Sequence, residues 1–512
     1  MLKGKKKVFF IILGISCFLA VFLSGCKTTK EVETVVDYSD ERSLLYAIDQ
    51  VKKIMEKDPV RALWRARILF DNATNNRHMV ESLYSDAAIR TADEFKTMIS
   101  AEKWNDALRI YRSLSVLSMA PGDWSEEKII ETRLRTWEEE GKTTLANLGT
   151  VQKSTPEDEA PSPRIVANMI QGTVTVWVDR GVRVQSGVGY ADRVIGSGFF
   201  IDKSGYIVTN YHVIASEVDP KYEGYSRLYI KLASDSDTRI PARVIGWDPV
   251  FDLALLKTEI EPSVVFQLGS SESLVVGTRI YAIGSPAGLE QTLTSGIVSA
   301  QKRRLISLGD ILQIDAPINQ GNSGGPIVDE AGRVQAIVFA GIESFEGLNF
   351  AIPVEYLKII LPDLYAGGEV SHPWVGAYGK TVALPGSSAP AGVGLFYAVP
   401  GEPSSVSGIP ENAVITSMNG IQVNTLEDLQ YQLIRQIPGS IVRLSGIAGE
   451  SESGEPQTRD WYVYLSNRPE VPGKLIFDRD IKSRALYPFF GMKLEKVGRF
   501  NKYVVTQIIK GA

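Results

Sequence analysis

The chain contains only three histidines, so the search for a catalytic base is short. His212 lies in a region of short β-rich segments, whereas His78 lies in a helical region and His372 in a segment between domains. Asp252 precedes a run of apolar residues, so its carboxylate can lie at the edge of a core, and Ser323 lies among glycines. A hydroxyl, an imidazole and a carboxylate are the groups that nucleophilic catalysis by serine requires. We therefore expect His212, Asp252 and Ser323 to act together.

Glycine surrounds the candidate nucleophile in the run Gly321-Asn322-Ser323-Gly324-Gly325-Pro326. Glycine allows positive φ angles, which turn consecutive amides toward one point. We expect an oxyanion hole at Gly321, Asn322 and Ser323, formed by the amides of Gly321 and Ser323. Taken singly, each part has a structural alternative, because a lone His or Asp is usually structural and a Gly-Ser cluster is usually a turn. Their order along the chain, His then Asp then Ser, is that of the chymotrypsin-type triad.

Four motifs together resemble the HtrA/Deg family (DegP-like, Do-type) of trypsin-like serine proteases. They are Gly196-Ser197-Gly198-Phe199-Phe200-Ile201, Thr209-Asn210-Tyr211-His212-Val213, Asp252-Leu253-Ala254-Leu255-Leu256-Lys257 and the Ser323 run. Further matches are Ala282 to Pro286, Thr294 to Ser299 and Asn349 to Pro353. The resemblance covers roughly residues 164–363. It implies a chymotrypsin-like double β-barrel, ATP-independent and cofactor-free cleavage of unfolded proteins through an acyl-enzyme, no metal, and assembly from trimers.

Two departures from the family pattern are visible. Gln320 stands where the family commonly has proline, a change outside the triad that we expect to be tolerated. A helical region precedes the protease, which makes trimer contacts near the protease N-terminus uncertain. Cleavage preference depends on the pocket around Ala340 to Leu348, whose shape the sequence does not give.

The region after the protease resembles a PDZ domain, predicted at residues 372–466. Its expected carboxylate-binding loop includes Trp374, Val375, Gly376 and Ala377, and a helix is expected over residues 426–433. In such a domain a peptide adds as a strand and its C-terminal carboxylate binds the loop amides. The alternative is a small β domain without a ligand. A partial second PDZ domain is predicted at 486–512; because the sequence stops before any helix of that domain, we expect a truncated copy.

The N-terminus has the layout of a lipoprotein signal peptide over residues 1–25. Four lysines precede an apolar run from Val8 to Leu23, and Ser24-Gly25-Cys26 follows. The resemblance to the lipoprotein cleavage box implies that Cys26 is lipidated and tethers an exported protein to the bacterial cell envelope, on its periplasmic or outer face. An ordinary cleavage site, or a permanent anchor, is the alternative. Cleavage would remove the four lysines and no acid, moving the formal charge from −5 to −9. Such an acidic body gives no reason to expect nucleic acid as a partner.

Residues 26–149 are predicted to be helical, with apolar residues at helical spacing that indicate four or five helices. A plain bundle is favoured over a tetratricopeptide-like fold, because no second copy of the repeat is found. We expect Asp58 to cap a helix that starts with Pro59, and Asp123 with Glu126 to form a capping box. The sequence Gly141-Lys142-Thr143 lacks the glycine cradle of a phosphate-binding loop. Residues 150–163 have the composition of a linker.

A length of 512 residues and ordinary apolar and charged fractions of 44% and 22% indicate a multidomain globular protein. The expected architecture is an N-terminal α-helical region, a double β-barrel protease, an α+β PDZ domain and a partial second one. The leading functional hypothesis is an envelope serine endopeptidase for protein quality control. A proteolytically silent chaperone or peptide-binding scaffold is the alternative. The helical region is also open to interpretation as a partner-docking module.

Overall fold

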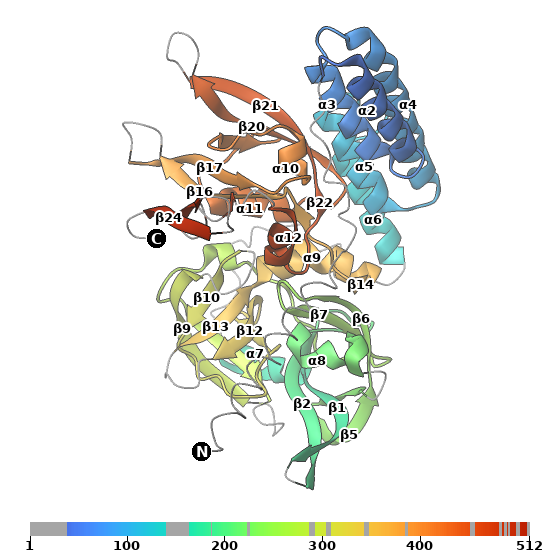
Figure 1. Cartoon of the computed structure of the whole chain (residues 1–512). Coiled ribbons are helices and arrows are strands. Elements are labelled where there is room, and N and C mark those ends of the chain that lie inside the picture. The colour runs from blue at the N-terminus through green and yellow to red at the C-terminus, as the bar shows by residue number, and fades with distance from the viewer. Residues whose placement is uncertain are drawn as a thin grey trace, which may run out of the picture.

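The computed structural model describes residues 38–139 and 163–508, with short gaps at 186, 223–225, 286–291, 304–308, 342–347, 384–387, 451–455, 481–483, 486–488, 490–491 and 498–501. Cys26, the Gly141-Lys142-Thr143 sequence, most of the predicted linker and most of the predicted specificity pocket lie outside these residues. Within the described part of the chain, no helix is both long and apolar enough to cross a membrane. Figure 1 shows the helical region beside the PDZ sheet, with the protease below them.

The described part of the N-terminal region is a bundle of five helices, as the apolar spacing predicts. Its helices are α2 (Glu41–Met55), α3 (Pro59–Asn72), α4 (Arg77–Ser100), α5 (Trp104–Val116) and α6 (Glu126–Glu139). The predicted cap of α3 is confirmed, because Asp58 accepts a hydrogen bond from Arg61 N at 3.0 Å and Pro59 lies in the first turn. The predicted Asp123–Glu126 capping box is wrong.

Helix α6 begins two residues too late for that box. Glu126 is its first residue, so Ser125 occupies the cap position, and Ser125 Oγ accepts a hydrogen bond from Lys128 N at 3.1 Å. Glu126 instead pairs with Arg112 of α5 at 2.5 Å. A hydroxyl directly before the helix therefore takes the role that we assigned to a carboxylate two residues earlier.

The first half of the protease is an eight-stranded sheet with the order β14-β6-β7-β3-β2-β1-β4-β5. Its strands are β1 (Thr173–Gln185), β2 (Val188–Phe200), β3 (Tyr206–Thr209), β4 (Arg227–Leu232), β5 (Asp235–Pro241), β6 (Arg243–Asp248), β7 (Leu253–Lys257) and β14 (Gly368–Glu369). Side chains alternate along β1, where Val174, Val176 and Val178 are fully buried. The short helix α7 (Pro163–Met169) precedes this sheet, and helix α8 (Tyr211–Val218) packs on it.

The second half of the protease is a closed six-stranded barrel. It consists of β8 (Arg279–Gly284), β9 (Thr292–Arg303), β10 (Ile311–Ile314), β11 (Pro326–Val328), β12 (Val334–Gly341) and β13 (Asn349–Pro353). The predicted arrangement of two β domains is thus confirmed. In the described residues the strand pairing closes the second domain into a barrel, whereas the first is an eight-stranded sheet. Helix α9 (Val354–Ala366) follows and extends beyond the predicted domain boundary at residue 363. It lies between the protease and the PDZ domain in Figure 1.

The PDZ region contains a sheet with the order β16-β17-β18-β20-β21. Its elements are β15 (Pro373–Trp374), β16 (Ala377–Ala383), β17 (Pro390–Ala398), α10 (Pro403–Val406), β18 (Val414–Met418), β19 (Ile421–Gln422), α11 (Leu426–Ile434), β20 (Ile441–Glu450), β21 (Pro456–Tyr464) and β22 (Ser466–Asn467). Thr425 and Asp428 form a capping box at the start of α11. Beyond this domain lie α12 (Pro472–Arg479) and the hairpin of β23 (Met492–Val497) and β24 (Lys502–Ile508).

Candidate active site

His212 and Asp252 form a two-point contact. His212 lies in the first turn of α8, directly after β3, and Asp252 lies just before β7. Asp252 Oδ2 is 2.7 Å from His212 Nδ1, and Asp252 Oδ1 accepts a hydrogen bond from the backbone N of His212 at 2.8 Å. One carboxylate therefore fixes both the ring and the backbone of the histidine. A proton on Nδ1 that bonds to the carboxylate leaves Nε2 able to accept a proton.

The turn that carries Asp252 is constrained on both sides. Asp252 has a φ of 55°, a left-handed conformation that Asp tolerates better than most residues. Its carbonyl accepts hydrogen bonds from Tyr211 N at 3.1 Å and from Asn210 Nδ2 at 2.8 Å. Asp248 Oδ1 accepts from the amides of residues 250 and 251 at 2.8 and 3.1 Å. Neither Asn210 nor Asp248 was predicted as a site residue, although both lie within or beside the motifs that carry the resemblance.

Ser323 lies in the loop between β10 and β11, next to the histidine segment. A Cβ placed on Gly196 would meet Val213 Cγ2 at 2.6 Å and Ser323 O at 3.1 Å, so this glycine allows the two segments to approach. Ser323 Oγ donates a hydrogen bond to Phe339 O at 3.4 Å. Among the hydrogen bonds of the described residues, none joins Ser323 Oγ to His212. The structure brings the histidine and the acid into contact, while the hydroxyl of Ser323 is bonded to Phe339 O.

The loop before Ser323 has the backbone of a type II turn. Gly321 has a φ of 105°, and the amide of Asn322 donates to Asn319 O at 3.0 Å. Positive φ at the third position of this turn requires glycine. In the described part of the chain, the amides of Gly321 and Ser323 donate to no protein acceptor. Of the three residues predicted for the oxyanion hole, Asn322 therefore has its amide engaged in the turn, while the other two amides are available.

Ser197 holds this loop in place and was missed as a site residue. It is fully buried; its Oγ donates to Gly321 O at 2.6 Å and accepts from Ser285 N at 2.9 Å. Its backbone N donates to Ser323 O at 2.8 Å. Gly324, with a φ of 84°, lies so close that an added Cβ would be 2.4 Å from Ser197 O. In the sequence the Gly196-Ser197-Gly198 motif indicates only the family resemblance, whereas in the structure its serine supports the loop that carries Ser323.

The predicted PDZ loop retains unpaired amides beside a free sheet edge. Val375 O accepts two hydrogen bonds from Ser404, from its N at 2.8 Å and its Oγ at 2.6 Å, and Gly376 has a φ of 71°. Within the described residues, the amides of Val375 and Gly376 have no protein acceptor. The loop leads from Trp374 into Ala377, the first residue of β16, which is the end strand of its sheet. This arrangement can receive a carboxylate at the loop and a peptide strand along β16.

The other two histidines lie away from Ser323. His78 is exposed on α4. His372 is buried, and its Nε2 is 2.8 Å from Asp248 Oδ2, so the segment between protease and PDZ domain is attached to the turn that carries Asp252. This pair was not predicted. The spacing of Asp248, four residues before Asp252, is the only sequence signal that could have suggested it.

The fold and the site geometry define a trypsin-like serine peptidase. Residues 196–337 match the model of the trypsin-like peptidase domain, and residues 473–512 match that of the TP0546 family PDZ domain. Residues 42–135 match a domain of unknown function, DUF8517. The solved HtrA-type protease AlgW with tripeptide aligns with a TM-score of 0.51 and 25% identity, covering 61% of this chain and 99% of that one.

Relatives extend the match beyond the peptidase domain. The chain is 31% identical over 350 residues to the "Probable periplasmic serine endoprotease DegP-like" of Ectopseudomonas mendocina (strain ymp), covering 65% of this chain and 72% of the relative. It is 35% identical over 260 residues to the protein of the same name from Pseudomonas fulva (strain 12-X), covering 49% and 52%. "Protease Do-like 1, chloroplastic" of Arabidopsis thaliana is 35% identical over 266 residues, covering 47% and 57%. The chain belongs to this DegP-like, HtrA-type family of serine endoproteases and is a serine endopeptidase.

Proposed function

We propose that Ser323 is the nucleophile, His212 the general base and acid, and Asp252 the group that orients the imidazole. The observation that carries this assignment is the two-point contact of Asp252 with His212. In the reaction, Ser323 Oγ turns from Phe339 O toward His212 Nε2 and attacks the scissile carbonyl carbon while Nε2 takes its proton. The amides of Gly321 and Ser323 then stabilise the oxyanion. His212 returns the proton to the leaving amine, and water hydrolyses the acyl-enzyme by the same steps.

Digestion of casein tests this assignment. The wild-type chain is expected to degrade casein and Ser323→Ala to lose that activity, with Ser273→Ala, an exposed serine of the same domain, as the matched control. Equal rates for wild type and Ser323→Ala would reject the mechanism and favour the silent scaffold.

We propose unfolded or misfolded envelope proteins as substrates, with the PDZ loop at Trp374, Val375, Gly376 and Ala377 recognising C-terminal peptides. The free amides of the loop and the unpaired edge of β16 support this role. A labelled peptide with a free C-terminal carboxylate is expected to bind, and the same peptide with an amidated C-terminus is expected to bind much more weakly. Equal binding of the two peptides would contradict carboxylate recognition.

We propose export to the cell envelope and attachment through lipidated Cys26. The periplasmic location named for the bacterial relatives supports export. Metabolic labelling with palmitate is expected to mark the wild-type protein and not Cys26→Ser; an equally labelled variant would refute the anchor. Assembly from trimers is likewise proposed, from the family resemblance, and native mass spectrometry of the detergent-solubilised protein tests it.

A further inference from the structure

The helical domain and the PDZ domain share a hydrophobic core. Ile441, the first residue of β20, is fully buried within the core of the helical bundle. Trp64 of α3 is 2% exposed and stacks on Tyr464 of β21, with ring centroids 5.5 Å apart and an angle of 28°. Trp64 Nε1 also donates to Tyr462 O at 2.9 Å. The interface between the two domains is therefore packed like a protein interior and not like a hydrated surface contact.

Buried polar groups fix the register of this contact. Ser113 Oγ of α5 accepts a hydrogen bond from Ile441 N at 3.0 Å. Tyr464 OH donates to Asp58 Oδ2 at 2.8 Å, while the other oxygen of Asp58 caps α3. Burial, and secondarily the negative charge of Asp58, raise the pKa of Tyr464, so its hydroxyl stays a donor at physiological pH. Bonds of this kind are lost if the domains slide, which makes one orientation preferred.

The helical domain contacts the PDZ sheet on the side away from the predicted peptide groove. It packs on β20 and β21, at one end of the strand order, whereas β16 lies at the other end. Figure 1 shows the helices beside β20 and β21, with β16 on the opposite side of the sheet. Contact from this side reaches the sheet at β20 and β21 and not at β16, whose Tyr378 contacts Phe489 instead.

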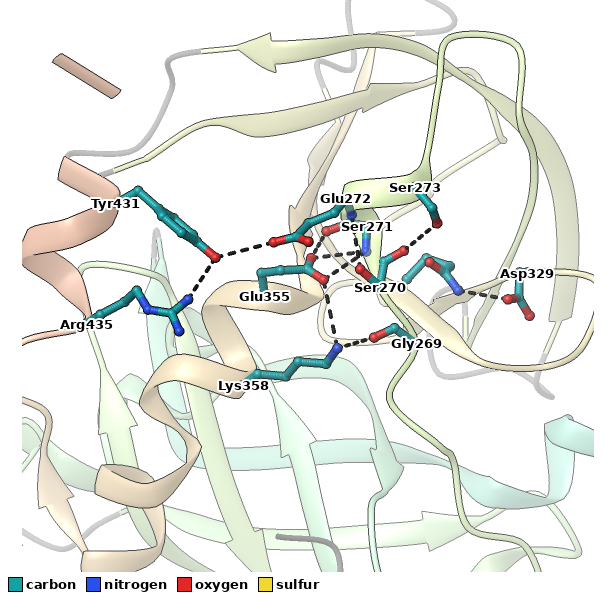
Figure 2. A network of polar contacts seen from close by, with 11 residues as sticks. Gly269, Ser270, Ser271, Glu272, Ser273, Asp329, Glu355, Lys358, Tyr431 and Arg435 are labelled. Carbon is teal, nitrogen blue, oxygen red and sulfur yellow. Dashed lines mark hydrogen bonds and ion pairs between the residues drawn. The ribbon is translucent and has the colours of Figure 1, made fainter. Parts of the chain in front are cut away.

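The C-terminal end of α11, the helix beside the groove, is held from two sides. Arg112 of the helical domain donates to Arg435 O at 3.0 Å. On the protease side, Arg435 Nη1 donates to Tyr431 OH at 2.9 Å, and Tyr431 OH donates to Glu272 Oε1 at 3.3 Å (Figure 2). Figure 2 also shows Glu272 beside Ser271, whose amide donates to Glu355 of α9 at 3.0 Å.

The direct contact between the helical domain and the protease involves fewer residues than its contact with the PDZ domain. Asn105 Nδ2 donates to Asp363 Oδ1 of α9 at 3.3 Å, and Arg133 Nη1 donates to Asn105 Oδ1 at 2.8 Å. A cavity of about 350 Å³ opens at this junction, between the α4–α5 turn and the end of α9. The helical domain thus shares a buried core with the PDZ domain and contacts the protease through these polar groups and through Leu134 of α6, which packs against the core around α9.

We propose that the helical domain, residues 41–139, is an intramolecular brace that holds the PDZ domain in one orientation against the protease. Its binding partner is the β20–β21 edge of the same chain, recognised by the buried Ile441 and by the hydroxyl of Tyr464. The brace contacts β20, β21 and the C-terminal end of α11. It therefore fixes the position of α11 without occupying the predicted groove beside β16. Without it, the PDZ domain would be positioned by the contacts of α11 with the protease, which include Tyr431 and the buried Ile434, and by the His372 segment.

Distances between spin labels on the full chain test the brace. Cys17→Ser and Cys26→Ser remove both native cysteines, and Ser323→Ala prevents self-digestion. Labels are placed on cysteines introduced at exposed positions of the protease, Val276, and of the PDZ domain, Gln422. The labelled chain is assembled with an excess of the cysteine-free chain, so that distances between subunits of a trimer do not contribute. Double electron–electron resonance in detergent is then expected to give one narrow distance distribution for this parent chain. Because no proteolysis is measured, the result does not depend on the proposed catalytic residues.

Ile441→Asp places a charge in the shared core and is expected to replace the narrow distribution with a broad one. Ile89→Asp is the matched control, because Ile89 is 60% exposed on α4, and it is expected to leave the distribution narrow. A distribution as narrow for Ile441→Asp as for the parent would overturn the brace. If Ile441→Asp does not fold by circular dichroism, the rim variant Tyr464→Phe/Arg109→Ala decides. It removes the hydroxyl of Tyr464 and the bond from Arg109 to Gly439 O; broadening supports the brace and an unchanged width refutes it.

Discussion

Ser197→Ala tests how the nucleophile loop is held. The substitution removes one hydroxyl that donates to Gly321 O at 2.6 Å and accepts from Ser285 N at 2.9 Å. The backbone bond from Ser197 N to Ser323 O remains, because it does not involve the side chain. The variant therefore removes the side-chain bonds to the Gly321 carbonyl and the Ser285 amide and leaves the backbone bond to Ser323 in place.

The magnitude follows from the two groups left behind. Gly321 and Ser285 are both buried, and a buried polar group that loses its hydrogen bond costs about 1–3 kcal/mol. We expect a loss of stability of roughly 2–6 kcal/mol if neither group finds a new partner. For catalysis, a Gly321 peptide that rotates displaces one donor of the oxyanion hole. Losing such a donor entirely costs roughly 10²–10³ in kcat, which sets the upper limit of the effect.

Steady-state cleavage of a chromogenic peptide measures kcat and KM separately, and titration of active sites corrects for any unfolded fraction. We expect kcat per folded molecule to fall by roughly 10–100-fold with KM nearly unchanged, because the lost interaction acts on the transition state. Ser273→Ala, which removes an exposed hydroxyl, is expected to match the wild type. If folded Ser197→Ala retains wild-type kcat, the Gly321 carbonyl does not need this support and the reasoning fails.

Three further predictions concern the acidic groups around the catalytic turn. Asp252→Asn is expected to lower kcat by roughly 10⁴-fold with little change in KM, because the amide cannot stabilise His212 as an imidazolium. Steady-state peptide kinetics measure this effect, and a loss of kcat below about tenfold would contradict the role of Asp252. His372→Ala leaves Asp248 buried without its partner and is expected to lower both the melting temperature and kcat, with a destabilisation of roughly 3–5 kcal/mol; His78→Ala is the exposed control. Burial raises the pKa of Asp363 above its ordinary value of 3.8, so the folded state binds a proton more readily than the unfolded state and wild-type stability falls as pH rises through this window. Asp363→Asn lacks that loss, so urea unfolding is expected to show its advantage growing from acidic to neutral pH, and a difference independent of pH would refute the shift.

The sequence predicted those elements whose pattern follows from local physics. The helix cap at Asp58 and the strand after Asp252 depend on neighbouring residues only, and the structure confirms both. In β7 the apolar run is continuous because both of its faces are covered. Leu253 and Leu255 face a core that is shared with the second barrel and α9. Leu256 points to the other side, into the core enclosed by the strands of the first sheet. In a strand with one face exposed to solvent, apolar and polar residues would alternate.

Other features depend on contacts between distant segments and were not predictable from spacing. Apolar spacing predicted the helices of the N-terminal region, yet the buried face of α4 carries Thr91, whose hydroxyl bonds to Ala87 O at 2.8 Å and to Pro59 O of α3 at 3.1 Å. A polar residue can occupy a core position when its own helix satisfies it. The contact of Ile441 with the helical bundle likewise joins segments more than 300 residues apart. No periodicity within either segment identifies the other.

The catalytic turn and the orientation of the domains depend on the same atoms. Asp248 supports the turn before Asp252 through one carboxylate oxygen and binds His372, on the path to the PDZ domain, through the other. The backbone carbonyl of His372 accepts a hydrogen bond from Arg468 N at 2.8 Å, just beyond β22. Displacing the PDZ domain therefore strains the support of Asp252, even though no PDZ residue needs to enter the active site. A brace that limits this displacement would maintain catalytic geometry from the far side of the molecule.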